Sequence, residues 1–414
     1  MVDISDSTDI EEGERKLSGT GLAGTNLERA GGYNQRVTLQ AIRINGSVTR
    51  SELVELTGLT APAIANITRR LLDAGLVENI GRVQGARGQP AMRFAINPDG
   101  RFAIGLNIDR DYVTMVAVDF HGRIKARATT NRKFAMPDEV ADFFRENLEL
   151  FFTRDGIPRS KVMGVGIAVP DDLGTVESND RPAAYEAWAG FDLQNMIQSI
   201  ADYPVFIEND AAAAAIGELQ FGHGLHSSNF LYLLVTSGLG AGLVVEGSYF
   251  RGAHGRSGEL GFLPVSSPLT KAKTLSEVVS VAGLKRHMRG RGYALSSLAE
   301  VEGLEGEARA ACDEWLALSV EALTGPILAT IYLMDPDAVY IGGRLPHSLV
   351  DKMAGMLNEA IAETGVKIAA PFRVASAALS ADAPAVGAAI MPFFDMLLPN
   401  RASLMKTVAA DQVI

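Results

Sequence analysis

The chain has 414 residues, enough for two or three domains, and its 47% of hydrophobic and 21% of charged residues exclude a fibrous or wholly disordered protein. Three further features predict a cytoplasmic protein. The longest uncharged apolar run, 383–394, is shorter than the roughly 18 residues of a membrane-spanning helix, and residues 1–12 are too acidic for a signal peptide. The single Cys312 excludes intramolecular disulfides and cysteine-cluster metal sites. The net charge of −11 argues against indiscriminate binding of polyanions.

The N-terminal region begins with a segment, 1–32, that is acidic and then rich in Gly, Ser and Thr without sustained periodicity, so we predict a disordered tail there. A first helix is predicted between 34 and 45, because apolar residues recur at helical spacing. The residues expected to form its buried face are Val37, Ala41 and Ile44.

Two further helices and a hairpin are predicted between 49 and 98. Thr49-Arg50-Ser51-Glu52 is a capping-box pattern that starts a helix ending at Gly58, and Thr60 can cap the next helix, which ends at Gly75. The apolar residues expected to face inward are Leu53, Leu56, Ile64, Ile67, Leu71 and Leu72. Strand-like stretches at 76–80 and 91–96 flank a flexible basic loop. This order within 33–98 is the layout of a winged helix-turn-helix domain.

Residues 33–96 hold eight arginines, no lysine and four acids, although the whole chain is acidic. A local basic excess on such a layout predicts binding to duplex DNA, with an asparagine on adenine in the major groove and loop arginines in an adjacent minor groove. The residues predicted to contact DNA are Thr60, Pro62, Ala63, Asn66, Arg69, Arg70, Arg82, Arg87 and Gln89. The alternative is a small helical oligomerisation domain with an arginine-coated surface.

From residue 99 onward the pattern is that of an α/β protein. Buried strands are predicted at 102–107, 112–118, 123–128, 162–169 and 205–207, and then at 230–235, 242–245, 249–250 and 338–341. Helical stretches separate the later strands of each series. Two tandem units that each open with antiparallel strands predict a duplicated, two-lobed α/β domain over 99–398, with ligands bound between the lobes and a tail at 399–414.

Four ordered motifs stand out in this domain. They are Glu208-Asn209-Asp210-Ala211-Ala212-Ala213-Ala214, Thr236-Ser237-Gly238-Leu239-Gly240-Ala241-Gly242, Arg251-Gly252-Ala253-His254-Gly255-Arg256-Ser257-Gly258-Glu259-Leu260-Gly261 and Ile341-Gly342-Gly343. With them the chain resembles the ROK family (repressors, open reading frames and sugar kinases), and within it transcriptional regulators of the xylose-repressor and N-acetylglucosamine-repressor type. The resemblance covers about 33–394 and implies an actin/hexokinase-like fold.

The resemblance also implies a sugar site formed by Asn209, Asp210 and Glu259. From the residues alone, Asn209 and Asp210 follow a strand and precede a helix, so either can instead cap that helix. In family kinases the aspartate that matches Asp210 is the general base. The glycines of 236–242 allow either the approach of a phosphate or close packing, and we expect the structural role, because the same turn persists in family repressors that bind no nucleotide.

Departures from the family pattern argue against a kinase. The opening aspartate of family kinases is Asn107 here, and the Gly-Gly-Thr turn that cradles ATP phosphates is Asp109-Arg110-Asp111. Two carboxylates there repel a phosphate. Phe262 stands where the family's zinc-binding histidine is expected, and the cysteines are missing. A sugar-binding glutamate aligns with Ser276, beside Glu277, so the sugar pocket is only partly matched.

These features predict a DNA-binding transcriptional regulator, a repressor, that senses a sugar or sugar derivative without phosphorylating it. We expect no catalytic residues, cofactor, bound metal or membrane contact, and we expect a homodimer or higher homo-oligomer on a near-palindromic operator. Two alternatives remain open: an active sugar kinase with an appended DNA-binding domain, and a dimeric DNA-binding scaffold that senses nothing.

Overall fold

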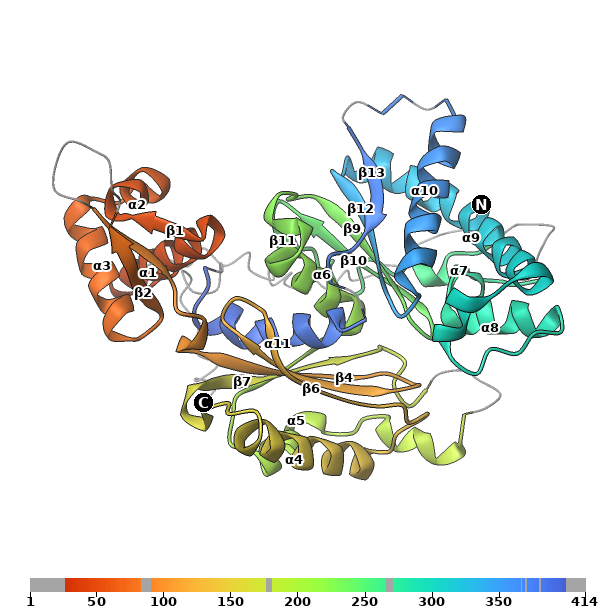
Figure 1. Cartoon of the computed structure of the whole chain (residues 1–414), viewed down its shortest axis with the longest axis horizontal. Coiled ribbons are helices and arrows are strands. Elements are labelled where there is room, and N and C mark those ends of the chain that lie inside the picture. Colours follow the sequence, from red (N-terminus) through yellow and green to blue (C-terminus); the bar gives the residue numbers. More distant parts are fainter. Residues whose placement is uncertain are drawn as a thin grey trace, which may run out of the picture.

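The computed structural model describes residues 27–399 apart from 83–90, 176–180, 266–270, 366, 369–370 and 380. Two five-stranded sheets dominate it (Figure 1). The strands of the first are β4 (Phe102–Ile108), β5 (Val113–Asp119), β6 (Ile124–Thr130), β7 (Val162–Val169) and β8 (Val205–Asn209). The strands of the second are β9 (Phe230–Val235), β10 (Leu239–Val245), β11 (Ser248–Tyr249), β12 (Ala338–Gly343) and β13 (Arg373–Ser376).

The two sheets have the same topology. Their strand orders are β6-β5-β4-β7-β8 and β11-β10-β9-β12-β13. In each, the first three strands in the chain pair antiparallel and the last two join in parallel. This equivalence agrees with the predicted duplication and gives each lobe one edge where the carboxyl ends of parallel strands meet.

Helices cover the outer face of each sheet. In the first lobe these are α4 (Pro137–Thr153) and α5 (Leu193–Ile200). The second lobe carries α7 (Leu275–Val278), α8 (Val281–Gly290), α9 (Gly306–Met334) and α10 (His347–Glu363). Helix α4 buries Val140, Phe144, Leu148 and Phe151, which recur every three or four residues and pack on the first sheet.

Two helices, α6 (Asp210–Phe221) and α11 (Ala383–Met396), lie between the sheets (Figure 1). Glycines allow their backbones to approach very closely: a Cβ on Gly387 of α11 would overlap the carbonyl oxygen of Ala213 in α6. A Cβ on Gly242 of β10 would lie 2.8 Å from the carbonyl oxygen of Ala211. Helix α6 is therefore packed in direct backbone contact with both α11 and the second sheet.

The N-terminal module consists of three helices and a small sheet. Its elements are α1 (Leu27–Asn45), β1 (Ser47–Thr49), α2 (Arg50–Thr57), α3 (Ala61–Asp73), β2 (Val77–Arg82) and β3 (Met92–Ile96), with strand order β1-β3-β2. The predicted capping box is confirmed, since Thr49 accepts a hydrogen bond from the backbone N–H of Glu52 and Glu52 accepts one from Thr49. Gly58 ends α2 with a positive φ of 69°.

Several details of this module differ from the prediction. Helix α1 begins at Leu27, inside the segment predicted to be a disordered tail. Ile44 and Leu56, predicted to be buried, are 50% and 53% exposed, whereas Leu39 and Ile42 are almost fully buried. The buried face of α1 also includes polar Thr38 and Arg43, whose hydrogen bonds make burial tolerable, and a hydrophobic pattern does not mark such residues. Thr60 is the N-cap of α3 but makes no side-chain capping bond.

The module shares an apolar core with the body of the protein. One cluster of buried residues joins Leu39 and Ile42 of α1 to Ile390 and Phe393 of α11. Phe393 packs edge-on against Phe120, with ring centroids 5.0 Å apart. The module is therefore docked on α11 rather than carried on a bare linker (Figure 1).

Among the described residues one helix, α9, is long and apolar enough to cross a membrane by length and composition. A third (33%) of its most apolar 18-residue stretch is buried inside the protein. The search of the sequence for uncharged apolar runs did not find this helix, because Glu321 interrupts it. Its Trp315, Leu316 and Leu323 lie in the core of the second lobe. Part of the apolar surface of α9 is therefore buried in the core of the second lobe.

Candidate functional site

Asn209 is the last residue of β8 and the N-cap of α6. Its Oδ1 accepts hydrogen bonds from the backbone N–H groups of Ala211 (2.9 Å) and Ala212 (3.1 Å), so the capping role is real. Its Nδ2 is directed elsewhere and donates to Oδ1 of Asp171 at 3.0 Å. Asn209 thus caps the helix and holds a carboxylate that follows the neighbouring strand.

Asp210 is the first residue of α6 and is 9% exposed. Burial raises the pKa of its carboxyl group to about 7, and the nearby Asp109 carboxylate contributes to the increase. The backbone N–H of Ala211, which donates to Oδ1 at 2.7 Å, opposes that shift. Near neutral pH this carboxyl group is therefore present in both its protonated and ionised forms, able to donate or accept a hydrogen bond.

Glu259 lies half-buried in the loop after β11. Its Oε1 accepts a hydrogen bond from Nε of Arg256 at 3.3 Å. Its pKa is raised mainly by burial and then by the hydrogen bond and charge of Asp171. Glu259 and Asn209, which are distant in sequence, therefore both contact the same side chain, Asp171.

Asp171 is the site residue that the sequence prediction missed. It follows β7, and in the parallel pairing of β7 with β8 Val169 lies beside Asn209. The carboxyl ends of neighbouring parallel strands meet at one edge, so the position of Asp171 two residues after β7 was an available signal. The charges of Asp171 and Asp172 both raise the pKa of Asp210, and Asp171 also raises the pKa of Glu259. These four acidic side chains therefore lie in one polar site.

The segment Asp109-Arg110-Asp111, which stands in place of the family's phosphate-binding turn, packs against the glycine segment 236–242. Asp109 is 3% exposed and accepts a hydrogen bond from Oγ of Ser237 at 2.7 Å, and burial raises its pKa. A Cβ on Gly238 would lie 2.8 Å from Nη2 of Arg110, so the guanidinium lies against the glycine segment. Side chains of this protein thus lie against the backbone that a nucleotide phosphate would approach.

Two of the glycines of 236–242 pack closely against α6. Gly240 and Gly242 lie within β10 and not in a turn. A Cβ on Gly240 would come 2.8 Å from the Cβ of Ala211. These two glycines therefore allow α6 to pack directly on β10.

Other expected pocket residues have separate partners. Oγ of Ser276 accepts a hydrogen bond from the backbone N–H of Leu239 at 3.1 Å, and Glu277 accepts one from Lys273 at 3.0 Å. Phe262, at the position of the zinc ligand, is 66% exposed. In the described part of the chain no group of three or more His, Cys, Asp and Glu side chains is arranged to hold a metal ion.

The outer face of α3 is exposed and polar. Of the predicted DNA contacts, Thr60, Pro62, Asn66, Arg69 and Arg70 are exposed and Ala63 is half-buried. Nη2 of Arg69 donates to Oδ1 of Asn66 at 2.8 Å, so these two side chains are held together one turn apart. Arg87 and Gln89 lie outside the described residues, as does the side chain of Arg82.

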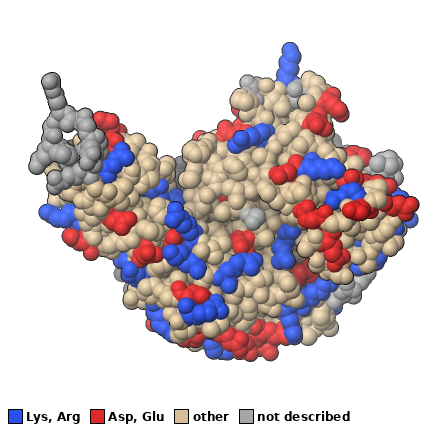
Figure 2. Space-filling view, in the orientation of Figure 1, with Lys and Arg blue, Asp and Glu red and all other residues tan. Residues whose placement is uncertain are grey.

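Four of the eight arginines behind the basic excess make contacts that hold the module together or join it to the body. Arg36 and Arg43 bind the body of the protein, Arg50 donates to Thr68, and Arg93 pairs with Glu52. The charge count therefore overstated the basic surface. Figure 2 shows basic and acidic side chains interspersed over the visible face of the molecule.

The structure has the architecture of two-lobed, sugar-kinase-like α/β proteins. It has two equivalent sheets with α6 and α11 between them, and polar side chains lie at the carboxyl edge of the first sheet. The chain belongs to the ROK family, whose model matches residues 103–392.

Individual relatives include both regulators and kinases. The chain is 28% identical over 374 residues to the uncharacterized protein y4fQ of Sinorhizobium fredii, covering 87% of this chain and 91% of that protein. It is 30% identical over 236 residues to the xylose repressor of Bacillus spizizenii, covering 56% of this chain and 60% of the repressor.

Solved structures share the fold at lower identity. A ROK family transcriptional regulator, described as a homologue of the E. coli MLC protein, has a TM-score of 0.65 at 22% identity and covers 89% of this chain and 98% of its own. A ROK glucokinase from Streptomyces griseus in complex with glucose and AMPPNP has a TM-score of 0.54 at 21% identity, covering 70% of this chain and 98% of its own.

Proposed function

We propose that this protein is a DNA-binding transcriptional regulator, a repressor, that senses a sugar or sugar derivative in the ROK domain. The observation that carries the proposal is the exposed polar face of α3, with Asn66 and Arg69 held together, in a module docked on a sugar-kinase-like body. We interpret the module, 33–98, as a winged helix-turn-helix with α3 as its recognition helix. The similarity to the regulator structure covers 89% of the chain and so extends beyond the ROK domain.

The sensing site in this proposal is the polar edge formed by Asn209, Asp210, Asp171 and Glu259. Carboxylate and amide groups at strand ends are suited to hydrogen-bond several hydroxyls of one sugar ring. The four side chains come from three segments, so a sugar that contacts them all bridges those segments. The names of the xylose repressor, the glucokinase and a further similar structure, described as an N-acetylmannosamine kinase from Listeria monocytogenes, suggest a test panel of D-xylose, D-glucose and N-acetylmannosamine.

A sugar kinase is the second candidate, because kinases are among the relatives and Asp210 has the raised pKa that suits a general base. The contact of Arg110 with the glycine segment and the buried Asp109 favour the regulator. We expect no ATP hydrolysis above background with any sugar of the panel, measured as ADP release. Sugar-dependent turnover would establish the kinase.

The regulator is proposed to act as a cytoplasmic homodimer. A single α3 reads a short half-site, so specificity requires two copies on a two-fold symmetric operator. Helix α9 offers a surface for such a dimer, because Tyr332 and Leu333 are 63% and 81% exposed near its C-terminal end.

Selection from random duplex DNA tests the proposal. The full chain should enrich an inverted repeat, and a variant with Arg69→Ala and Arg70→Ala should lose the enrichment while retaining its fold by circular dichroism. Arg145→Ala, on α4 in the other part of the molecule, is the matched control and should enrich the same sequence. Absence of any enriched sequence with the wild type, or equal enrichment by the α3 variant, would contradict the proposal.

A further inference from the structure

Helix α6 connects the polar site to the N-terminal module. Its N-terminal end carries Asn209 and Asp210 in the site, and twelve residues later its last turn reaches α1. At 1.5 Å per residue this helix spans about 18 Å. A single rigid element therefore has the sensing site at one end and the module at the other.

Arg43 of α1 makes the contact at the far end. It is 9% exposed, its Nη1 donates to the backbone carbonyl of Gln220 at 3.0 Å, and its Nη2 donates to Oε1 of the same residue. The guanidinium also lies over the ring of Phe221, 5.4 Å from the centroid. No ion pair between Arg43 and a carboxylate is present within the described residues.

The buried charge is instead neutralised by the end of the helix. The last carbonyls of α6 lack partners within the helix and carry its partial negative charge, which favours a cation at this position. Burial lowers the pKa of Arg43 to about 10, so the guanidinium is still protonated at neutral pH. A buried cation held in this way is sensitive to the position of the helix end, because a small displacement leaves it without a partner.

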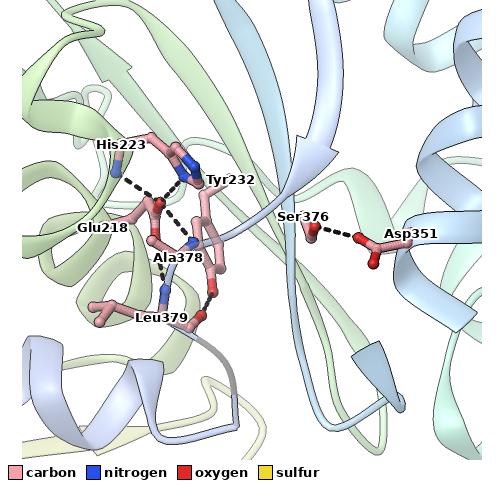
Figure 3. A network of polar contacts seen from close by, with 7 residues as sticks. All are labelled: Glu218, His223, Tyr232, Asp351, Ser376, Ala378 and Leu379. Atoms are coloured by element: carbon pink, nitrogen blue, oxygen red, sulfur yellow. Dashed lines mark hydrogen bonds and ion pairs between the residues drawn. The ribbon is translucent and has the colours of Figure 1, made fainter. Parts of the chain in front are cut away.

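The surroundings of α6 favour movement as a unit. Close backbone contacts with Gly387 of α11 and Gly242 of β10 restrict bending along its length. Near its C-terminal end the buried carboxylate of Glu218 accepts hydrogen bonds from the backbone N–H groups of Ala378 (3.0 Å) and Leu379 (3.1 Å), in the segment between β13 and α11 (Figure 3). A shift of the N-terminal end is therefore passed to the C-terminal end.

We propose that Arg43 is the positioning residue that transmits the state of the sugar site to the DNA-binding module, through its contact with Gln220 at the end of α6. The inference rests on the proposed function. Sugar contacts at Asn209 and Asp210 change the position of α6, and the guanidinium of Arg43 carries that change to α1. The orientation of α3 relative to the DNA then changes with it.

Arg36 provides a matched comparison on the same helix. Its Nη1 donates to the backbone carbonyls of Asp395 (2.5 Å) and Leu398 (3.2 Å), at the end of α11 rather than of α6. Arg36 and Arg43 thus anchor the module by the same chemistry to two different helices. Only Arg43 binds the helix that begins in the site.

The experiment measures operator affinity with and without the most effective of D-xylose, D-glucose and N-acetylmannosamine, in wild type, Arg43→Gln, Arg43→Lys and Arg36→Gln. Sugar affinity is measured separately by calorimetry. In Arg43→Gln we expect sugar binding within about twofold of wild type but a ratio of operator affinities below about two, against the roughly 5–150-fold of a typical allosteric coupling. Arg43→Lys should restore part of the ratio, and Arg36→Gln should keep it.

Hydrogen exchange of the wild type supplies a second measurement that needs no variant. The sugar should change the protection of backbone amides at the C-terminal end of α1 as well as at the start of α6. This inference alone is overturned if the ratio of operator affinities with and without sugar in Arg43→Gln equals that of the wild type. It is also overturned if the sugar leaves the hydrogen exchange of α1 unchanged. A wild type whose operator affinity does not respond to any of the three sugars overturns the proposed sensing function, and the inference with it.

Discussion

Asp210 is a side chain of the site whose ionisation changes on folding. Its pKa rises from 3.8 to about 7 on folding, so between these pH values the folded protein holds a proton that the unfolded chain releases. Stability contributed by this group is therefore fully present below about pH 4 and is lost as pH rises through 7. Above that pH the fold carries the cost of a buried carboxylate.

This sign gives a prediction for Asp210→Asn. The variant keeps an oxygen that can accept from the N–H of Ala211 but carries no charge, so it should exceed the wild type in stability by about 2–4 kcal/mol at about pH 8 and by much less at about pH 5. Urea unfolding at both pH values measures the difference. Asp202→Asn, in the exposed loop before β8, should show no such change with pH. If the difference in free energy of unfolding between Asp210→Asn and the wild type is the same at both pH values, the raised pKa of Asp210 is contradicted.

Arg69 and Asn66 should have separable effects on DNA binding. Because an arginine contributes charge and an asparagine mainly reads a base, Arg69→Ala should weaken operator affinity by about 1–3 kcal/mol, whereas Asn66→Ala should chiefly broaden the accepted sequences. Binding titrations against the selected operator and single-base variants test this. If both variants lost affinity equally for every sequence, α3 would not be reading bases.

At the scale of single residues, the sequence analysis assigned Asn209 and Glu259 to one site, and the structure brings both of them to Asp171, which the sequence analysis did not identify. Asn209 was identified through a family motif and through its position before an alanine-rich helix. Asp171 belongs to no such motif. Its contribution depends on the pairing of β7 with β8, which is a property of the sheet and not of the local sequence.

Among the elements, the contact between α6 and α11 is the one most sensitive to a single methyl group. Gly387→Ala would place a Cβ on the carbonyl oxygen of Ala213, and the two helices must separate to accept it. We expect a loss of about 3 kcal/mol or more in the free energy of unfolding, measured by denaturant titration.

Gly355→Ala is the matched control for that change. Gly355 also lies within a helix, α10, but nothing approaches its added Cβ within 4 Å. There the higher helix propensity of alanine should stabilise the protein by up to about 1 kcal/mol. Equal effects of the two substitutions would show that close packing between α6 and α11 is not a determinant of stability.

Elements with clear periodicity were predicted well, and those without it were not. Strands β7 and β9 have the predicted bounds. Helix α11 was seen only as an apolar run, because it is buried on nearly all sides and includes Pro392, so it has no polar face to give a helical period. Strand β10 was partly taken for a turn because its glycines serve the packing of α6.

At the scale of the whole molecule, the exposed apolar end of α9 predicts the dimer contact. Leu333→Asp should convert the proposed dimer to a monomer in sedimentation velocity experiments, because a charge at the centre of an apolar interface is left without solvent. Leu150→Asp, at a 40% exposed position of α4, should leave the dimer intact. A dimer that persists in Leu333→Asp would place the interface elsewhere.

The arrangement of the module on the body was beyond the reach of the sequence. The duplicated sheets follow from the order of strands, which a linear pattern records. Arg43 and Gln220 are 177 positions apart and neither belongs to a motif, so nothing local marks them as partners. The count of arginines indicated a basic surface, whereas four of them stabilise the module or its junction with the body.

The most direct test of the account is a titration of the selected operator with the wild-type protein, repeated at saturating D-xylose, D-glucose and N-acetylmannosamine. A sugar that bridges the segments carrying Asn209, Asp171 and Glu259 should favour one arrangement of the domain and change operator affinity by roughly 5–150-fold, the range of typical allosteric couplings. Saturable operator binding that changes within this range for at least one sugar is the predicted result. Operator affinities that are identical with and without all three sugars would contradict the account of this protein as a sugar-sensing regulator.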